Sequence, residues 1–230
     1  IRHAEYIGGR FSSLTSTGLL PATVMGANPF LIRKSARTAL DYILEEKFFF
    51  KLGSGFFWDD LPNGNKLNCT MSYGDFLDPL IRWYRQLWSE SLGKKGNGIF
   101  FVSAKGPVDQ HSQMQMWLDG PNIGLYSILL SSSDDAKINI PQSKFLPWSR
   151  SYTLDNLSNV MAYAAYDSLK SKNRPVRMIN MPSRNPESIA SLMVIFLVEV
   201  LILAELKNIN PYGQPAVEDI KVKTLNRLNK

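Results

Sequence analysis

Short apolar segments alternate with longer amphipathic ones along most of this 230-residue chain, and this alternation constrains the fold more than any other feature. Short apolar runs between turn residues are typical of buried strands, whereas apolar residues spaced three or four apart are typical of helices. Strands that alternate with helices favour a parallel sheet covered on both faces, an α/β architecture. Strands are predicted at 66–73, 99–103, 123–130 and 175–181, a loop at 53–65, and helices at 14–25, 29–46, 75–92, 109–118, 153–171, from 185 and from 214.

The most apolar stretch runs from Leu192 to Leu206 and contains Glu199 and Glu205. It is shorter than the roughly 20 residues that a bilayer span needs. We therefore expect a buried helix in a globular core and no contact with a membrane.

The charge balance bears on the kind of partner. A formal net charge of +6 suits an anionic partner. The Lys and Arg residues are scattered, however, and the basic tail 221–230 is too thin for a nucleic-acid footprint. A single cysteine, Cys69, with only His3 and His111 argues against a protein-built metal site and fits a reducing compartment.

The first of four segments with chemical potential is 6–12. Its paired glycines, Gly8 and Gly9, allow a tight turn or the close approach of a ligand, and Arg10 suits an anion or a developing negative charge. A plain turn with a solvated arginine is the alternative.

The second segment is 86–94. Gln86 and Glu90 lie at i and i+4, on one face near the end of a predicted helix. The helix dipole disfavours a carboxylate there, which suits a general base. An exposed glutamate beside a Gly93 C-cap is the alternative.

The third segment, 106–115, places His111 at the start of a predicted helix, where a neutral imidazole that relays a proton is favoured. A hydrogen-bonded structural histidine is the alternative. In the fourth segment, 210–221, Gln214 and Lys221 lie two turns apart on one helix face, so Lys221 can reach a site at the helix start. A solvated lysine is the alternative.

Together, the order and spacing of these segments resemble the glucose-6-phosphate isomerases. The matching patterns, between Gly8 and Lys221, are GGR-[FY]-S, Q-x-x-x-E-S-x-G-K, Q-H and [FY]-x-Q-x-[GA]-V-E-x-x-K. The chain departs from the family at Gly213, where a polar or acidic residue is usual, and at Ala216, where glycine is commoner.

The resemblance implies roles for the matching residues. Glu90 would move a proton between two carbons through a cis-enediol intermediate, and Arg10 would stabilise the developing negative charge. His111 and Lys221 would assist ring opening. The substrate-binding residues would be Gly9, Gln86 and Gln214, and no metal or organic cofactor is implied.

The resemblance also implies a fold of two sugar-isomerase (SIS) domains. Residues 1–50 would contain the end of the first domain with linker helices, and 51–230 the second domain with a C-terminal helix. The second domain would be a three-layer αβα sandwich around a mainly parallel five-stranded sheet. The enzyme would be a cytoplasmic homodimer in which His111 reaches the neighbouring subunit's site.

The family's phosphate-binding Ser/Thr loop has no match in these residues, and Ser131–Ser133 is no substitute because it follows a predicted strand. We therefore expect a C-terminal portion of the isomerase that is nearly inactive alone. A non-catalytic SIS module that binds a sugar phosphate is the alternative.

Overall fold

A computed structural model describes residues 5–45, 67–131 and 138–229. The described strands form one parallel sheet in the order β2-β1-β3-β4. Their bounds are β1 (Leu67–Tyr73), β2 (Phe100–Gly106), β3 (Gly124–Ser131) and β4 (Val176–Met181). The predicted α/β class with a parallel sheet is therefore confirmed, although the described residues supply four strands rather than the expected five.

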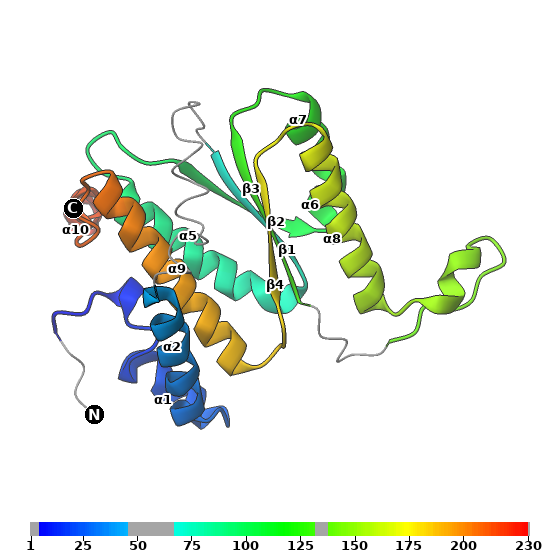
Figure 1. The fold of residues 1–230 in the computed structure, drawn as a ribbon. Helices are drawn as coiled ribbons and strands as arrows, with labels where there is room; N and C mark the ends of the chain where they lie inside the picture. Colours follow the sequence, from blue (N-terminus) through cyan, green and yellow to red (C-terminus); the bar gives the residue numbers. More distant parts are fainter. Residues whose placement is uncertain (1–4, 46–66, 132–137, 230) are drawn as a thin grey trace.

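Helices cover both faces of the sheet (Figure 1). The α-helices are α1 (Ser16–Val24), α2 (Pro29–Leu44), α5 (Asp78–Leu92), α6 (Val108–Ser112), α7 (Met114–Asp119), α8 (Leu154–Ser171), α9 (Pro186–Leu206) and α10 (Pro215–Leu228). Short 3-10 turns are η1 (Gly9–Phe11), η3 (Asp75–Leu77) and η4 (Pro147–Ser151). Helices α5 and α9 lie on one face, and α6, α7 and α8 lie on the other.

Each face of the sheet has its own apolar core because alternate residues of a strand point to opposite sides. On β3, Leu125 and Leu129 pack with α5 and α9, whereas Ile128 packs with α8. The first core centres on Tyr84 and Phe196, whose rings stack with centroids 3.9 Å apart. Large buried rings contribute much of the favourable free energy of such a core.

Helix α9 is long and apolar enough to be a candidate membrane span by length and composition. In the structure it lies between α5 and α2, and Phe196, Val200 and Ala204 are fully buried. On its other side, Ala190 and Val194 pack against α2. The prediction of a buried core helix is therefore confirmed.

One predicted helix needs correction, and one predicted loop lies outside the described residues. The helix expected at 109–118 is two short helices, α6 and α7, because the chain bends at Gln113, whose φ and ψ are −122° and −20°. The predicted loop at 53–65 lies outside the described residues.

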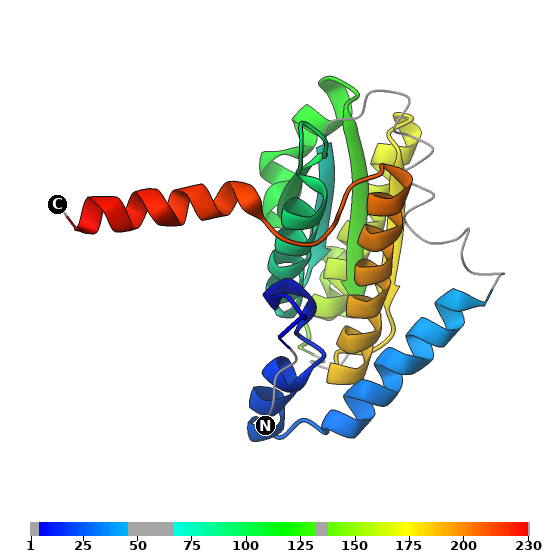
Figure 2. The ribbon, with the colours of Figure 1, turned by 90° about the vertical axis from the view of Figure 1, so that its left-hand side faces the viewer.

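Helix α10 has no buried residue and projects away from the body (Figure 2). The preceding segment returns from the end of α9 and passes the end of α5. This path brings residues 210–214 beside Glu90 and Arg10.

Candidate active site

The carboxylate of Glu90 lies near the C-terminal end of α5. Helix α5 begins at the carboxyl end of β1 and runs back along the sheet, so its C-terminal end lies at the amino-terminal edge of the sheet. There, Trp88 Nε1 donates a hydrogen bond of 2.8 Å to the carbonyl of Ile99, the residue just before β2. Gln86 Nε2 donates a hydrogen bond to Glu90 Oε1 at 2.9 Å. The prediction that Gln86 and Glu90 share one helix face is therefore confirmed.

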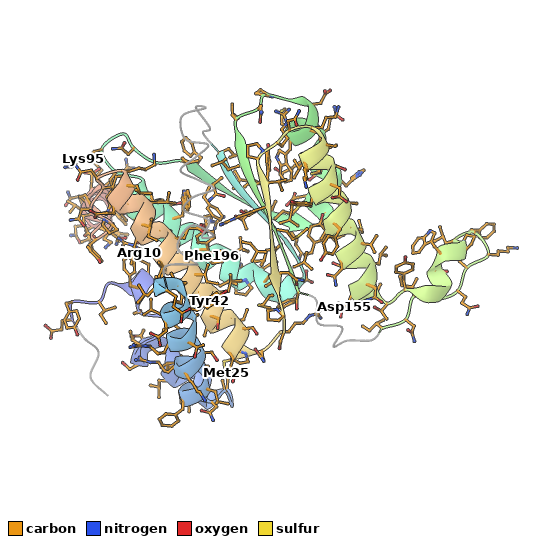
Figure 3. All side chains as sticks on the ribbon, in the orientation of Figure 1. Arg10, Met25, Tyr42, Lys95, Asp155 and Phe196 are labelled. Atoms are coloured by element: carbon orange, nitrogen blue, oxygen red, sulfur yellow. The ribbon has the colours of Figure 1, made fainter. Side chains whose placement is uncertain are left out.

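Arg10 meets Glu90 although 80 residues separate them in the sequence. The turn η1 places its guanidinium against the end of α5, and the residue is only 6% exposed. Nη1 forms an ion pair with Glu90 Oε2 at 3.1 Å, and Nε donates to Ser91 Oγ at 3.0 Å. Figure 3 places Arg10 at the end of the molecule where α5 and α9 finish.

The other side of the Arg10 guanidinium contacts the segment before α10. Nη2 donates to the carbonyl oxygens of Pro211 and Gly213, the second at 3.1 Å. These bonds and those to Glu90 and Ser91 use four of the five N–H groups of arginine. One Nη1 hydrogen beside the carboxylate is left for another acceptor.

A pocket of ≈ 470 Å³ opens beside this ion pair. Glu90 and Gln214 both line it, although they belong to segments more than 100 residues apart. The structure therefore brings the second and fourth predicted segments together. Gly9 is exposed in η1, and an added Cβ would meet nothing within 4 Å, so no crowding at this position demands a glycine.

Lys94 is a further pocket residue, which sequence reasoning did not select. Its Nζ donates to the carbonyl oxygens of Asn210 and Tyr212 at 2.7 and 2.6 Å. Its pKa is lowered, chiefly by burial and then by the charge of Arg10, with Glu90 acting in the opposite direction. Its position just after Gly93, the C-cap of α5, was the available signal, because lysines at helix ends often bind carbonyl groups.

Lys221 is not brought to Glu90 in this chain. It lies on the projecting α10, where its Nζ pairs with Glu218 Oε1 at 2.7 Å, and both side chains are more than half exposed. Gln214, at the start of α10, is the part of the fourth segment that reaches the pocket.

His111 also lies apart from Glu90. It is exposed on α6, which follows the carboxyl end of β2 and covers the opposite face of the sheet from α5. The expected position at a helix start is wrong, because α6 has five residues and His111 lies in its last turn. Within one chain, His111 and Glu90 therefore cannot act on the same small substrate.

Among residues 5–45, 67–131 and 138–229, no cluster of three or more His, Cys, Asp or Glu side chains is placed to hold a metal ion. Cys69 is buried in β1 and unpaired, and burial raises the pKa of its thiol.

The chain was compared with known proteins. No family model matches it. It is 31% identical to a glucose-6-phosphate isomerase of Rubrobacter xylanophilus over 97% of this chain and 54% of that protein. It is 32% identical to a glucose-6-phosphate isomerase of Thermus thermophilus over 96% of this chain and 55% of that protein.

Two solved structures also superpose on this chain. A protein from Thermus thermophilus, described as hypothetical, superposes with a TM-score of 0.88 at 31% identity, over 98% of this chain and 56% of that one. A glucose-6-phosphate isomerase of Chlamydia trachomatis superposes with a TM-score of 0.74 at 16% identity, over 100% and 49%, and supports the fold alone.

The chain spans about half the length of the curated relatives it matches. The resemblance inferred from the four segments is confirmed: in sequence and in fold, this chain is similar over almost its whole length to part of the glucose-6-phosphate isomerases.

Proposed function

We propose that this chain carries the acid–base part of an aldose–ketose isomerase that interconverts glucose 6-phosphate and fructose 6-phosphate. One observation carries the proposal. The Glu90 carboxylate lines a pocket and is bound by both the Gln86 amide and the Arg10 guanidinium. These two contacts suit a general base, which must be held in position and must carry a negative charge before it accepts a proton. The names and the extent of the matching relatives support the same reaction.

In the proposed reaction, Glu90 removes the C2 proton of the open-chain aldose and returns it to C1, through a cis-enediol, while the hydroxyl proton of O2 passes to O1. When Glu90 accepts the proton its own charge is lost, and negative charge develops on the substrate oxygens. The neighbouring Arg10 guanidinium, 3.1 Å from the carboxylate, then stabilises the charge on the substrate. Such preorganised stabilisation is typically worth about 3–4 kcal/mol. The reaction needs no cofactor.

Gln214 and Gln86 are proposed to bind sugar hydroxyls at the pocket, and Gly9 to let the substrate approach the backbone. His111 and Lys221 are proposed to move the proton between the anomeric hydroxyl and the ring oxygen. Since His111 lies across the sheet from Glu90, we propose a homodimer in which each chain supplies His111 to its partner. Packing of the projecting α10 in the assembled enzyme would bring Lys221 to the substrate.

We further propose that the enzyme is cytoplasmic and that the 230 residues alone are nearly inactive. The family's phosphate-binding loop has no match in them, and catalysis uses binding energy from remote parts of the substrate. A 230-residue chain as active as the complete protein would contradict this second point.

The test is an isomerase assay in both directions, run on residues 1–230 and on the complete protein, with sugar phosphates followed by NMR. Turnover of both sugars by the complete protein is expected. A complete protein that is inactive on both sugar phosphates would sink the proposal. Stabilisation by sugar phosphates without turnover would favour a non-catalytic binding module instead.

A further inference from the structure

Four successive carbonyl groups before α10 are bound by two cations in alternation. Lys94 Nζ donates to the carbonyls of Asn210 and Tyr212, and Arg10 Nη2 donates to those of Pro211 and Gly213. We call residues 210–213 the carbonyl loop. One cation therefore holds the even positions of the carbonyl loop, and the other holds the odd ones.

The sequence of the carbonyl loop explains why its carbonyls are open to side-chain donors. Pro211 has no N–H, and Gly213 adopts a left-handed conformation with φ of +68°, so the segment departs from regular backbone pairing. Carbonyls outside a regular backbone ladder are bound by water or by side-chain donors. Charged donors give hydrogen bonds about twice as strong as neutral ones.

Both cations are themselves fixed to the end of α5. Arg10 is bonded to Glu90 and Ser91, and Lys94 follows directly on Gly93, the helix C-cap. The two cations therefore connect the helix that carries the proposed base to the loop that carries Gln214. Both Glu90 and Gln214 line the ≈ 470 Å³ pocket.

From this geometry we infer that Lys94 is a positioning residue, which holds the carbonyl loop so that Gln214 and the start of α10 face Glu90. The part of this inference that concerns catalysis rests on the proposed isomerase function. Lys94 acts through backbone carbonyls and not through the reacting atoms, so its loss should displace the pocket wall without unfolding the protein.

The electrostatics of Lys94 agree with a positioning role. Burial and the charge of Arg10 both lower its pKa, so its ammonium is kept near another cation at an electrostatic cost. The two carbonyl bonds and the nearby Glu90 offset this cost. An ordinary solvated lysine would move away from Arg10.

The test uses three variants of the complete protein. Lys94→Met keeps the aliphatic stem and removes the donors, whereas Lys94→Arg keeps donors that can reach two carbonyls. Lys207→Met is the matched control, since Lys207 is also partly exposed and lies three residues before the carbonyl loop.

Lys94→Met is expected to lower kcat by about 10–100-fold, as small misplacements of catalytic groups do. KM should rise as well, by about threefold or more, because Gln214, which is proposed to bind sugar hydroxyls, moves with the loop. Lys94→Arg should restore kcat to within about threefold of the wild type, and Lys207→Met should match the wild type. Thermal midpoints should stay within about 3 °C.

A second readout does not depend on activity. Hydrogen exchange of the peptide covering 210–217 should quicken by about tenfold or more in Lys94→Met and be unchanged in Lys207→Met. Wild-type kcat or unchanged exchange in Lys94→Met would overturn the inference. An inactive wild type would refute the proposed function, while faster exchange in Lys94→Met would still support the role of Lys94 in holding the loop.

Discussion

Replacing Arg177 by methionine should isolate a carboxylate inside the protein. Glu199, on α9, is fully buried, and Arg177 on β4 binds it through two hydrogen bonds of 2.8 and 3.1 Å. Arg177 also donates to Ser127 Oγ at 2.8 Å, and the Tyr84 hydroxyl donates to Glu199 Oε1. This network ties β3, β4, α5 and α9 together within one core.

The expected cost follows from this burial. Removing one partner of a buried ion pair typically costs about 3–5 kcal/mol, because the remaining charge stays in a medium of low polarity. With a urea m-value of about 2–3 kcal/mol/M for a chain of this size, the unfolding midpoint of Arg177→Met should fall by about 1–2.5 M. Replacing both charges, in Arg177→Met with Glu199→Leu, should recover most of this loss.

The assay is urea unfolding followed by far-UV circular dichroism. Arg37→Met is the control, because Arg37 pairs with Asp41 on the surface of α2, with both side chains at least half exposed. An exposed pair of this kind is worth about 0.3–0.5 kcal/mol. If Arg177→Met lowered the midpoint no more than Arg37→Met, or if the double variant recovered nothing, the reasoning about the buried network would be refuted.

Two further predictions concern capping and the buried thiol. Asn185→Ala should cost about 1 kcal/mol in urea unfolding, because Asn185 Oδ1 accepts from Ser188 N at 2.8 Å at the start of α9; no loss would contradict the cap. Cys69 should resist thiol reagents in the native state, since it is 1% exposed and burial raises its thiol pKa. Labelling should therefore follow unfolding, even at mildly alkaline pH where an unfolded thiol ionises; rapid native labelling would contradict this burial.

Much of the fold could be predicted from the sequence because the local signals agree with the final packing. Apolar periodicity and turn residues located each of the four described strands to within a few residues. The helix starts carry matching local signals, since Asn28, Thr153 and Asn185 each accept a hydrogen bond from the helix that they precede. Such signals act within one turn of the chain, which is why they can be read without tertiary structure.

Two features of the structure could not be predicted from local sequence signals. The bend at Gln113 divides a segment whose periodicity is continuous, and it moves His111 from a helix start to a helix end. Lys94 contacts residues more than 100 positions away, so the spacing within its own segment could not reveal that role.

Residues of the candidate site that share one helix could be placed from the sequence, but the contacts between separate segments could not. The i and i+4 spacing placed Gln86 beside Glu90. The resemblance selected both Glu90 and Arg10, but it did not predict that they form an ion pair. Periodicity also placed Lys221 on the face of Gln214, but it could not predict that α10 projects away from the body.

The central claim is that Glu90 is the base of an isomerase, and solvent deuterium exchange at C2 of the sugar phosphate tests it most directly. Glu90→Gln keeps the shape of the side chain and removes its basicity, so in the complete protein it should abolish exchange while thermal shifts with sugar phosphates persist. Glu205→Gln, at an exposed position on α9, should exchange like the wild type. Wild-type exchange in Glu90→Gln would contradict the account.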